Sequence, residues 1–399
     1  MQKQIKKNVL AKPQYIHVEA PPGLMEAALS ETKQILSSPL QDYKFTPEIS
    51  EDEGLIGLEN MDYRQGMELC YRSLCARNIW LRIHSAHVGS FGEMQKAFDK
   101  ISWAYYLPEG CLPQIEVRSF KSKLYHEGKI KEHLSDHLKS LGFKNSDEDL
   151  RIQLVQKSNR LEVFISLAGE DLYKRGFKSR LHTKAPLAEH LAAALLWDFA
   201  DYDEVFVPFA GSGTLAFEAL FQKHQIAPVN LGRDYGMDRF PASPETTAKF
   251  IRNGLAPKEF EPLAMSLLDF SEEQCEELRV NVVALEERLK CKMTVKVMKD
   301  DFFETKTDFL KDKKILLPLN PPYGIRLGQK QGSVHFYSRL GERLKELAEV
   351  CAAMEGFCLV PDEASYKALR QIIGEMYRKT AHINQGGRHI RALYFAAQK

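Results

Sequence analysis

Short apolar runs alternate with amphipathic segments throughout the second half of the chain. The apolar runs predict strands at residues 205–207, 263–268, 294–298, 315–319, 357–360 and 389–396. Helical periodicity lies between them, from about Thr214 and at residues 272–289, 334–349 and 363–376. Strands separated by helices predict a mostly parallel, doubly wound α/β sheet. Pro318 would remove a hydrogen-bond donor from a central strand, so we expect it near the end of its strand.

The N-terminal region mixes helices and strands without this regular alternation. Residues 65–75 predict a helix, and residues 114–117 and 161–167 predict strands. This pattern favours an α+β region ahead of the α/β domain. The best candidate for the boundary is the segment 173–188, because it carries several basic residues and no acidic residue before Ala188.

Composition narrows the class of protein. A chain of 399 residues predicts two or three domains, and a net charge of +1 means that nucleic-acid binding would depend on local basic patches. The seven cysteines form no CxxC pair and no zinc spacing, which predicts no metal site and a reducing, cytoplasmic location. The basic N-terminus lacks a following apolar segment, and the apolar run 191–196 is short, so we expect no signal peptide and no membrane span.

A glycine-rich turn follows the first strand of the α/β region. It consists of Pro208, Phe209, Ala210, Gly211, Ser212, Gly213 and Thr214. Glycines permit a sharp turn and a close approach of the backbone to a ligand, and the N–H groups of the following helix can bind a carboxylate or phosphate. The turn predicts a cofactor site, although a tight connection that binds nothing would have the same pattern.

Acidic residues follow the next two strands. Asp269 could accept hydrogen bonds from the ribose hydroxyls of a nucleoside, or it could cap the helix that begins near Ser271. Asp301, with Asp300 as the alternative, could accept the amino group of adenine while Phe302 covers the base. The competing interpretation of this second pair is an ordinary solvated loop.

The most specific motif is Asn320-Pro321-Pro322-Tyr323, directly after the apolar run 315–319. Two prolines fix the backbone angles of the loop. The Asn320 side chain and the Pro321 carbonyl could both accept hydrogen bonds from a planar NH2 group, and Tyr323 offers a ring on which an unpaired base could stack. The motif therefore predicts a catalytic loop for a base amine; a rigid surface turn is the alternative.

Two basic stretches are candidates for RNA binding. The first covers residues 118–131 and contains Arg118, Lys121, Lys123, Tyr125, His126, Lys129 and Lys131, with Glu127 as its one acid. The second covers residues 173–184 and contains Tyr173, Lys174, Arg175, Lys178, Arg180, His182 and Lys184. Such residues neutralise phosphates, although a solvated protein face has the same composition.

These motifs, in this order, resemble the amino-methyltransferases of the Rossmann-like class I fold. The longer string from Asn320 through Arg326 to Gly328 is similar to the bacterial guanine-N2 methyltransferases of 23S ribosomal RNA. So are the segments 171–177, 185–188 and 226–228. More loosely, the N-terminal region resembles a ferredoxin-like segment followed by a THUMP domain, an RNA-binding module.

The resemblance implies a domain plan and a set of roles. It implies a ferredoxin-like segment at 1–70, a THUMP domain at 71–171 and a class I methyltransferase domain with a mostly parallel seven-stranded sheet at 172–399. S-adenosylmethionine would be the cofactor, with residues 208–214 around its methionine moiety, Asp269 at the ribose, and Asp301 with Phe302 at the adenine. Asn320 to Tyr323 would hold the target amine, and large-subunit ribosomal RNA would be the partner. Because the sulfonium already carries its leaving group, no metal is needed.

The chain departs from this family at three places. Val207 stands where Asp is usual, Ser271 stands where a second acid is frequent, and Gly23-Leu24 is followed by Met25 instead of Glu. Two alternatives therefore stay open: an N6-adenine methyltransferase acting on DNA or RNA, which uses a similar loop, and a catalytically silent RNA-binding or assembly protein.

Overall fold

The computed structural model describes residues 12–37, 47–178, 187–257, 259–261, 263–322, 330–385 and 387–399. The chain forms two compact units. Unit 1 falls within the ranges Met1–Ala20, Leu29–Lys174 and Arg233–Ala256, and unit 2 within Pro21–Ala28, Arg175–Gly232 and Pro257–Lys399. Each unit therefore includes a segment whose neighbours in the sequence belong to the other unit.

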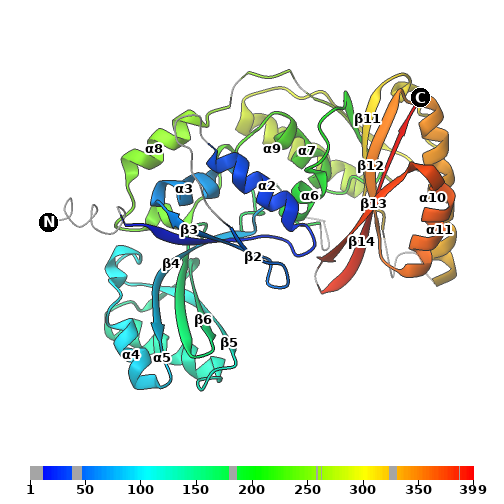
Figure 1. Cartoon of the computed structure of the whole chain (residues 1–399). Helices are drawn as coiled ribbons and strands as arrows, with labels where there is room; N and C mark the ends of the chain where they lie inside the picture. The colour runs from blue at the N-terminus through cyan, green and yellow to red at the C-terminus, as the bar shows by residue number, and fades with distance from the viewer. Residues whose placement is uncertain are drawn as a thin grey trace. The chain divides into compact units, whose positions relative to one another are not determined.

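Unit 1 is built on one seven-stranded sheet (Figure 1). Its strand order is β2 (Glu48–Ser50), β3 (Leu55–Met61), β1 (Gln14–Glu19), β4 (Asn78–His87), β7 (Arg160–Ser166), β6 (Asn145–Lys157) and β5 (Cys111–Phe120). All neighbours are antiparallel except β5 and β6, which α5 (Glu127–Ser140) connects as a parallel pair. Because this sheet joins strands from both N-terminal domains of the expected plan, the boundary near residue 70 stays a prediction.

Four further α-helices of the described residues belong wholly or partly to unit 1. They are α2 (Met25–Leu36), which starts in unit 2 and ends in unit 1, α3 (Tyr63–Arg72), α4 (Phe91–Phe98) and α8 (Glu245–Gly254). Of these, α3 and α4 contact β4, and α8 contacts α3. A capping box between Asp62 and Gln65 begins α3. Tyr71 on α3 donates to Asp238 at 2.5 Å, and Asp238 also accepts from Arg252 on α8. These contacts attach residues 233–256 to unit 1.

Unit 2 has the doubly wound architecture expected from the alternating pattern. Its strand order is β10 (Val295–Lys299), β9 (Ala264–Asp269), β8 (Glu204–Val207), β11 (Lys314–Leu319), β12 (Ala353–Val360), β14 (Arg388–Gln398) and β13 (Tyr377–Gln385). The first five strands are parallel, and β14 runs antiparallel to both of its neighbours. The predicted α/β fold with a mostly parallel seven-stranded sheet is confirmed.

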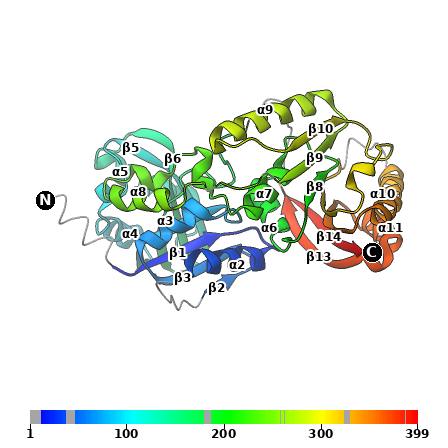
Figure 2. The same cartoon turned by 90° about the horizontal axis from the view of Figure 1, so that it is seen from above.

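Helices cover both faces of this sheet. Figures 1 and 2 place α6 (Glu189–Leu196) and α7 (Thr214–Lys223) on one face, and α10 (Lys330–Val350) and α11 (Glu363–Ile373) on the other. The helix α9 (Glu272–Leu289) lies beside β9 and β10 (Figure 2). The helices change face between the neighbouring strands β8 and β11, and ligands of such sheets bind where the strand order reverses, at the carboxyl ends of the strands.

Two special positions explain local sequence choices in unit 2. Pro318 is the second-last residue of β11, and β11 pairs with β8 only at Ile315 and Leu316. The ladder toward β8 has therefore ended before the proline, as we expected. Gly23 has a φ of +85°, and a Cβ there would lie 1.7 Å from the carbonyl oxygen of His382 on β13. Only glycine allows this segment to lie against the edge strand.

Candidate active site

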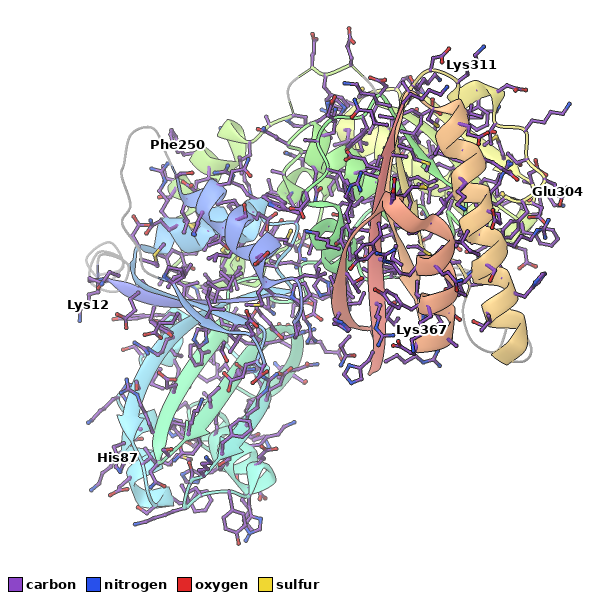
Figure 3. All side chains as sticks on the ribbon, turned by 45° about the vertical axis from the view of Figure 1, so that its right-hand side comes forward. Lys12, His87, Phe250, Glu304, Lys311 and Lys367 are labelled. Carbon is purple, nitrogen blue, oxygen red and sulfur yellow. The ribbon has the colours of Figure 1, made fainter. Side chains whose placement is uncertain are left out.

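The predicted site residues of the α/β domain follow the carboxyl ends of neighbouring parallel strands. β8 ends at Val207, β9 at Asp269, β10 at Lys299 and β11 at Leu319. Two labels in Figure 3 help to locate the ends of these strands. Lys311 lies just before β11 begins, and Lys367 lies in α11, after β12 has ended. The parallel register brings the glycine-rich turn, the two acidic loops and the Asn320 loop to one edge of the sheet.

The glycine-rich turn has the backbone geometry that its sequence predicted. Gly211 and Gly213 have φ values of +51° and +90°. A Cβ on Gly213 would lie 2.5 Å from the ring of Phe217 and 2.7 Å from Leu278, so only glycine fits. No side chain caps the first turn of α7 after Gly213. The N–H groups at the start of α7 are thus available to an anionic ligand.

Asp269 connects the turn to the next loop. Its Oδ2 accepts from the backbone N–H of Gly211 at 2.9 Å, and its Oδ1 accepts from the N–H of Ser271 at 3.0 Å. Ser271, not Asp269, caps α9, because its hydroxyl accepts from the N–H of Gln274. The carboxylate is only partly buried and keeps free lone pairs, so it can still accept hydrogen bonds from a ligand.

The loop after β10 is held by its own acids. Asp301 accepts from the N–H of Phe303 at 2.9 Å, and Asp300 accepts from the N–H of Asp301 and the hydroxyl of Thr305. Asp301 is half-buried and Asp300 is exposed. Both carboxylates order the loop, and both retain lone pairs for a further donor.

Phe209 of the glycine-rich turn and Phe302 of the loop after β10 pack at the hydrophobic core of unit 2. Phe302 is 2% exposed and lies in the hydrophobic core, with its ring centroid 5.6 Å from Phe209 and 6.0 Å from Phe206. Phe209 also contacts Phe336 of α10 at 6.1 Å. The structure therefore gives Phe302 a packing position under the turn, and its predicted role over the adenine stays a prediction.

The described part of the Asn320 loop contains a buried acceptor without a partner. The Oδ1 atom of Asn320 is buried, and no described residue donates a hydrogen bond to it. Pro321 is buried and Pro322 is half-buried, while Tyr323 lies outside the described residues. A buried amide oxygen left unpaired costs about 1–3 kcal/mol, so its retention calls for an explanation.

The segment that enters unit 2 is anchored on α7. Arg175 and Glu218 form a fully buried ion pair, with Nε to Oε1 at 3.1 Å and Nη2 to Oε2 at 3.0 Å. Burial raises the pKa of Glu218 to about 7, although the guanidinium of Arg175 acts in the opposite direction. Phe177 packs edge-on against Phe217 and Phe221. These contacts hold the segment along the helix that follows the glycine-rich turn.

In the described part of the segment 173–184, the three cations Lys174, Arg175 and Lys178 are paired within the protein, and the RNA-binding role of the whole segment stays a prediction. Lys174 pairs with Glu170, and Lys178 pairs with Glu189 at 2.9 Å. Arg175 is 2% exposed. These cations neutralise carboxylates of the protein itself and are not free phosphate ligands. Arg180, His182 and Lys184 lie outside the described residues.

The other basic stretch, 118–131, is open to solvent in unit 1. Lys121, Lys123, Lys129 and Lys131 are exposed, and none of them forms an ion pair with a described residue. Tyr125 is 65% exposed, and its ring lies 4.1 Å from that of His126. Phe120, which the sequence did not single out, is 48% exposed at the end of β5. The stretch combines free cations with exposed rings.

Two further residues at the edge of unit 2 escaped prediction from the sequence. Phe270 directly follows Asp269 and is 78% exposed, which is unusual for a phenylalanine. Glu189 lies at the start of α6 and reaches Lys178 beside the glycine-rich turn. The position of Phe270 directly after an acidic residue at a strand end could have indicated a role for it. No sequence pattern indicates the contact between Glu189 and Lys178, which lie eleven residues apart.

Metal clusters and membrane-spanning helices are absent from the described ranges. No cluster of three or more His, Cys, Asp or Glu side chains there could hold a metal ion. No helix in the described part is long and apolar enough to cross a membrane.

Comparison with known proteins agrees with this geometry. The family model for the RMKL-like methyltransferase domain matches residues 175–389. The ribosomal RNA large subunit methyltransferase K/L of Magnetococcus marinus is 28% identical over 72% of this chain. The alignment spans only 42% of that longer protein. The putative RNA methyltransferase YpsC of Bacillus subtilis is 26% identical over 69% of this chain and 75% of its own.

A solved structure shares the fold of nearly the whole chain. A putative methyltransferase crystallised as a complex with SAH is similar over 97% of this chain and 99% of its own, with a TM-score of 0.76 and 22% identity. The family match covers unit 2 from the Arg175 anchor to the last strand. From its sequence and the geometry of its strand ends, the chain belongs to the family of RMKL-like methyltransferase domains.

Proposed function

We propose that this protein is an S-adenosylmethionine-dependent RNA methyltransferase that modifies an exocyclic base amine, most specifically guanine N2 of large-subunit ribosomal RNA. The family supports methyl transfer, and the names of the K/L and YpsC relatives support an RNA substrate. The observation that carries the proposal is the buried Oδ1 of Asn320 at the carboxyl end of β11, to which no described residue donates a hydrogen bond. An amine donor would satisfy this acceptor.

The edge of unit 2 fits the proposed cofactor. The uncapped start of α7 suits an anionic group, and the partly exposed carboxylate of Asp269 suits a ribose. The exposed ring of Phe270, next to Asp269, offers an apolar surface for adenine, with Asp301 as a candidate acceptor for its amino group. When bound, the cofactor supplies a methyl group on a sulfonium, whose C–S bond breaks with its electron pair as the N–C bond to the amine forms.

The residues of this chain would position the amine and accept hydrogen bonds from it, and the proton released on methylation would leave to solvent. A base amine is a weak nucleophile because its lone pair is delocalised into the ring. Hydrogen bonds from both N–H groups, to Asn320 Oδ1 and to the Pro321 carbonyl, favour a pyramidal nitrogen whose lone pair points at the methyl group. Val207 is fully buried in β8, so the change from the family's usual Asp leaves the strand and its turn intact.

We assign RNA binding to the basic stretch 118–131 of unit 1. Its free lysines would neutralise phosphates, and the exposed rings of Phe120 and Tyr125 would stack on unpaired bases. This assignment agrees with a THUMP domain at 71–171 behind a ferredoxin-like segment at 1–70. A cytoplasmic enzyme would have direct access to ribosomal RNA.

Nucleoside mass spectrometry of RNA tests this function. Ribosomal RNA from a strain without the gene should lose one N2-methylguanosine, and the purified protein with S-adenosylmethionine should restore it. Loss of N6-methyladenosine instead would favour the adenine alternative. If calorimetry at millimolar S-adenosylmethionine detected no binding, the silent RNA-binding alternative would replace the proposal.

A further inference from the structure

A second ion pair lies beside the glycine-rich turn, and the proposed reaction does not use it. The ammonium of Lys178 contacts Glu189 Oε1 at 2.9 Å, the hydroxyl of Ser212 at 3.5 Å and the hydroxyl of Thr214. The side chains of Lys178 and Glu189 are 11% and 13% exposed. One positive and one negative group thus lie together at the first residue of α7, nearly removed from water.

This pair differs from the other buried pair on α7. Arg175 and Glu218 are 0% and 1% exposed and use both carboxylate oxygens, so they are closed to any ligand. Lys178 makes a single contact with its carboxylate, and Glu189 Oε2 accepts no hydrogen bond from a described residue. The pair keeps a free carboxylate oxygen and some access to solvent. Burying an incompletely bonded ion pair is unfavourable unless further hydrogen bonds satisfy it.

The described surroundings also supply backbone donors for an anion. No side chain caps the first turn of α7, and the amide of Asn281 fixes the carbonyl of Ser212 at 3.1 Å. The carbonyl of Ser212 is therefore turned to α9, and the N–H groups of the first turn remain. A ligand here meets backbone N–H groups and an ammonium on one side, and a carboxylate on the other.

We propose that Lys178 and Glu189 recognise the two charges of the amino-acid end of the cofactor, which is a zwitterion. The ammonium of Lys178 and the start of α7 receive the α-carboxylate, and the carboxylate of Glu189 receives the α-ammonium. The ligand adds no net charge to a nearly dry site, because each new charge meets its opposite. This inference rests on the proposed cofactor and assigns the two residues that would make the site specific for it.

Calorimetric titration of the full chain with three ligands tests each half of the pair. S-adenosylmethionine carries both charges, its decarboxylated analogue carries only the ammonium, and methylthioadenosine carries neither. The wild type should prefer S-adenosylmethionine to the decarboxylated analogue by about tenfold or more, the usual size of a charge-assisted hydrogen bond. Lys178→Met should reduce this ratio to about 1, and Lys178→Arg should retain most of it.

The second half of the pair has its own signature. Glu189→Gln should lower the affinities for S-adenosylmethionine and for the decarboxylated analogue by the same factor. It should leave the affinity for methylthioadenosine unchanged. Lys174→Met is the matched control, because Lys174 pairs with Glu170, which is no part of the proposed site, and its loss should change none of the affinities. If a single variant does not fold, Lys178→Met/Glu189→Gln replaces the pair with neutral side chains of similar size and should bind S-adenosylmethionine and its decarboxylated analogue nearly equally.

The outcomes separate this inference from the proposed function. Equal affinity of the wild type for S-adenosylmethionine and its decarboxylated analogue overturns the inference and leaves the function intact. If Lys178→Met lowers the affinities for all three ligands equally, the inference is also overturned, because that pattern reflects a merely structural role. Failure of the wild type to bind S-adenosylmethionine at all overturns the function and the inference together.

Discussion

The two units each contain a seven-stranded sheet, but they place their polar groups in different ways. In unit 2, five parallel strands bring successive loops to a single edge, and the acids and amides of those loops lie within reach of one another. In unit 1, nearly all neighbours are antiparallel, so loops are divided between two edges. Its basic stretch 118–131 begins in β5, a member of the one parallel pair among the described strands of unit 1.

The difference teaches how chemistry and recognition can be divided within one chain. The groups of unit 2 are partly or fully buried and oriented by backbone hydrogen bonds, as with Asp269 and Asp301. The lysines of the stretch 118–131 in unit 1 are exposed and form no ion pair with a described residue, as with Lys121 and Lys123. Buried, fixed groups suit an amine that must be positioned closely, whereas exposed cations suit a phosphate backbone that needs charge more than geometry.

The largest effect should come from breaking the buried pair on α7. Arg175→Met leaves Glu218 buried without its cation and should lower the free energy of unfolding by about 3–5 kcal/mol. Glu218 has its pKa raised by burial, so this loss should be smallest near pH 5 and should grow as pH rises through 7 and the carboxyl ionises. Urea unfolding at several pH values measures both effects.

The double variant Arg175→Met/Glu218→Gln provides the control for that experiment. Removal of both charges should recover most of the stability, because no unpaired ion remains. A single variant as stable as the wild type at pH 8 would show that the pair does not hold the 175–178 segment on α7.

The next effect concerns catalysis in unit 2. Asn320→Ala removes the unpartnered acceptor and should lower kcat by about a hundred- to a thousandfold while cofactor affinity stays the same. The same change should not destabilise the fold, because it removes an unsatisfied buried oxygen. Single-turnover assays with calorimetry of cofactor binding separate the two quantities, and near-normal turnover would contradict the assigned role.

A smaller effect should appear in unit 1. Reversing Lys121 and Lys123 to Glu should weaken RNA binding by about tenfold and flatten its dependence on salt, with no change in cofactor affinity. Lys33→Glu/Lys249→Glu is a control of equal charge change at other exposed positions of unit 1. Filter binding over a range of salt concentrations gives both numbers. Equal losses in the two double variants would indicate that net charge, not this stretch, controls binding.

The smallest effect should be a pH dependence confined to unit 1. Burial, together with the charge of Arg82, lowers the pKa of His17 to about 4, and its ring stacks on Phe164 at 4.6 Å. The unfolded chain takes up this proton near pH 6.5, so stability is full above that pH and falls toward pH 4. His17→Phe should remove about 1–2 kcal/mol of this decline. Urea unfolding of both proteins at pH 7, 5.5 and 4.5 measures this effect. A difference in the free energy of unfolding that stayed constant over these pH values would contradict the prediction.

Most of the unit 2 fold could be predicted because its core strands are short, continuous apolar runs. β13 was missed because only one of its nine residues, Ile383, is buried, so its sequence has no apolar run. The position of Pro318 could be predicted, since the missing N–H restricts where a strand can contain it. In unit 1 only the strands at 114–117 and 161–167 were predicted, and they correspond to β5 and β7. The sheet as a whole depends on pairings between distant segments that no local pattern specifies.

The residues of the candidate site could be predicted from the sequence. The ion-pair and hydrogen-bond partners of its residues could not. The turn at 208–214 and the loop at Asn320 contain glycines and prolines, whose effect on the backbone can be predicted from a single sequence. The pairing of Lys174, Arg175 and Lys178 with carboxylates of the chain could not be predicted, because composition counts charges without showing where they meet. The unpartnered oxygen of Asn320 is likewise a property of the folded interior alone.

The exchange of segments between the units has a consequence for how the chain is made. Residues 21–28 are translated long before β13, against which they lie. Residues 233–256 complete unit 1 only after the first helix of unit 2 has been translated. Unit 1 therefore has all of its segments only after residue 256 has been translated, and unit 2 only after β13 and β14. The narrow fit of Gly23 under the His382 carbonyl can form only after β13 has been translated.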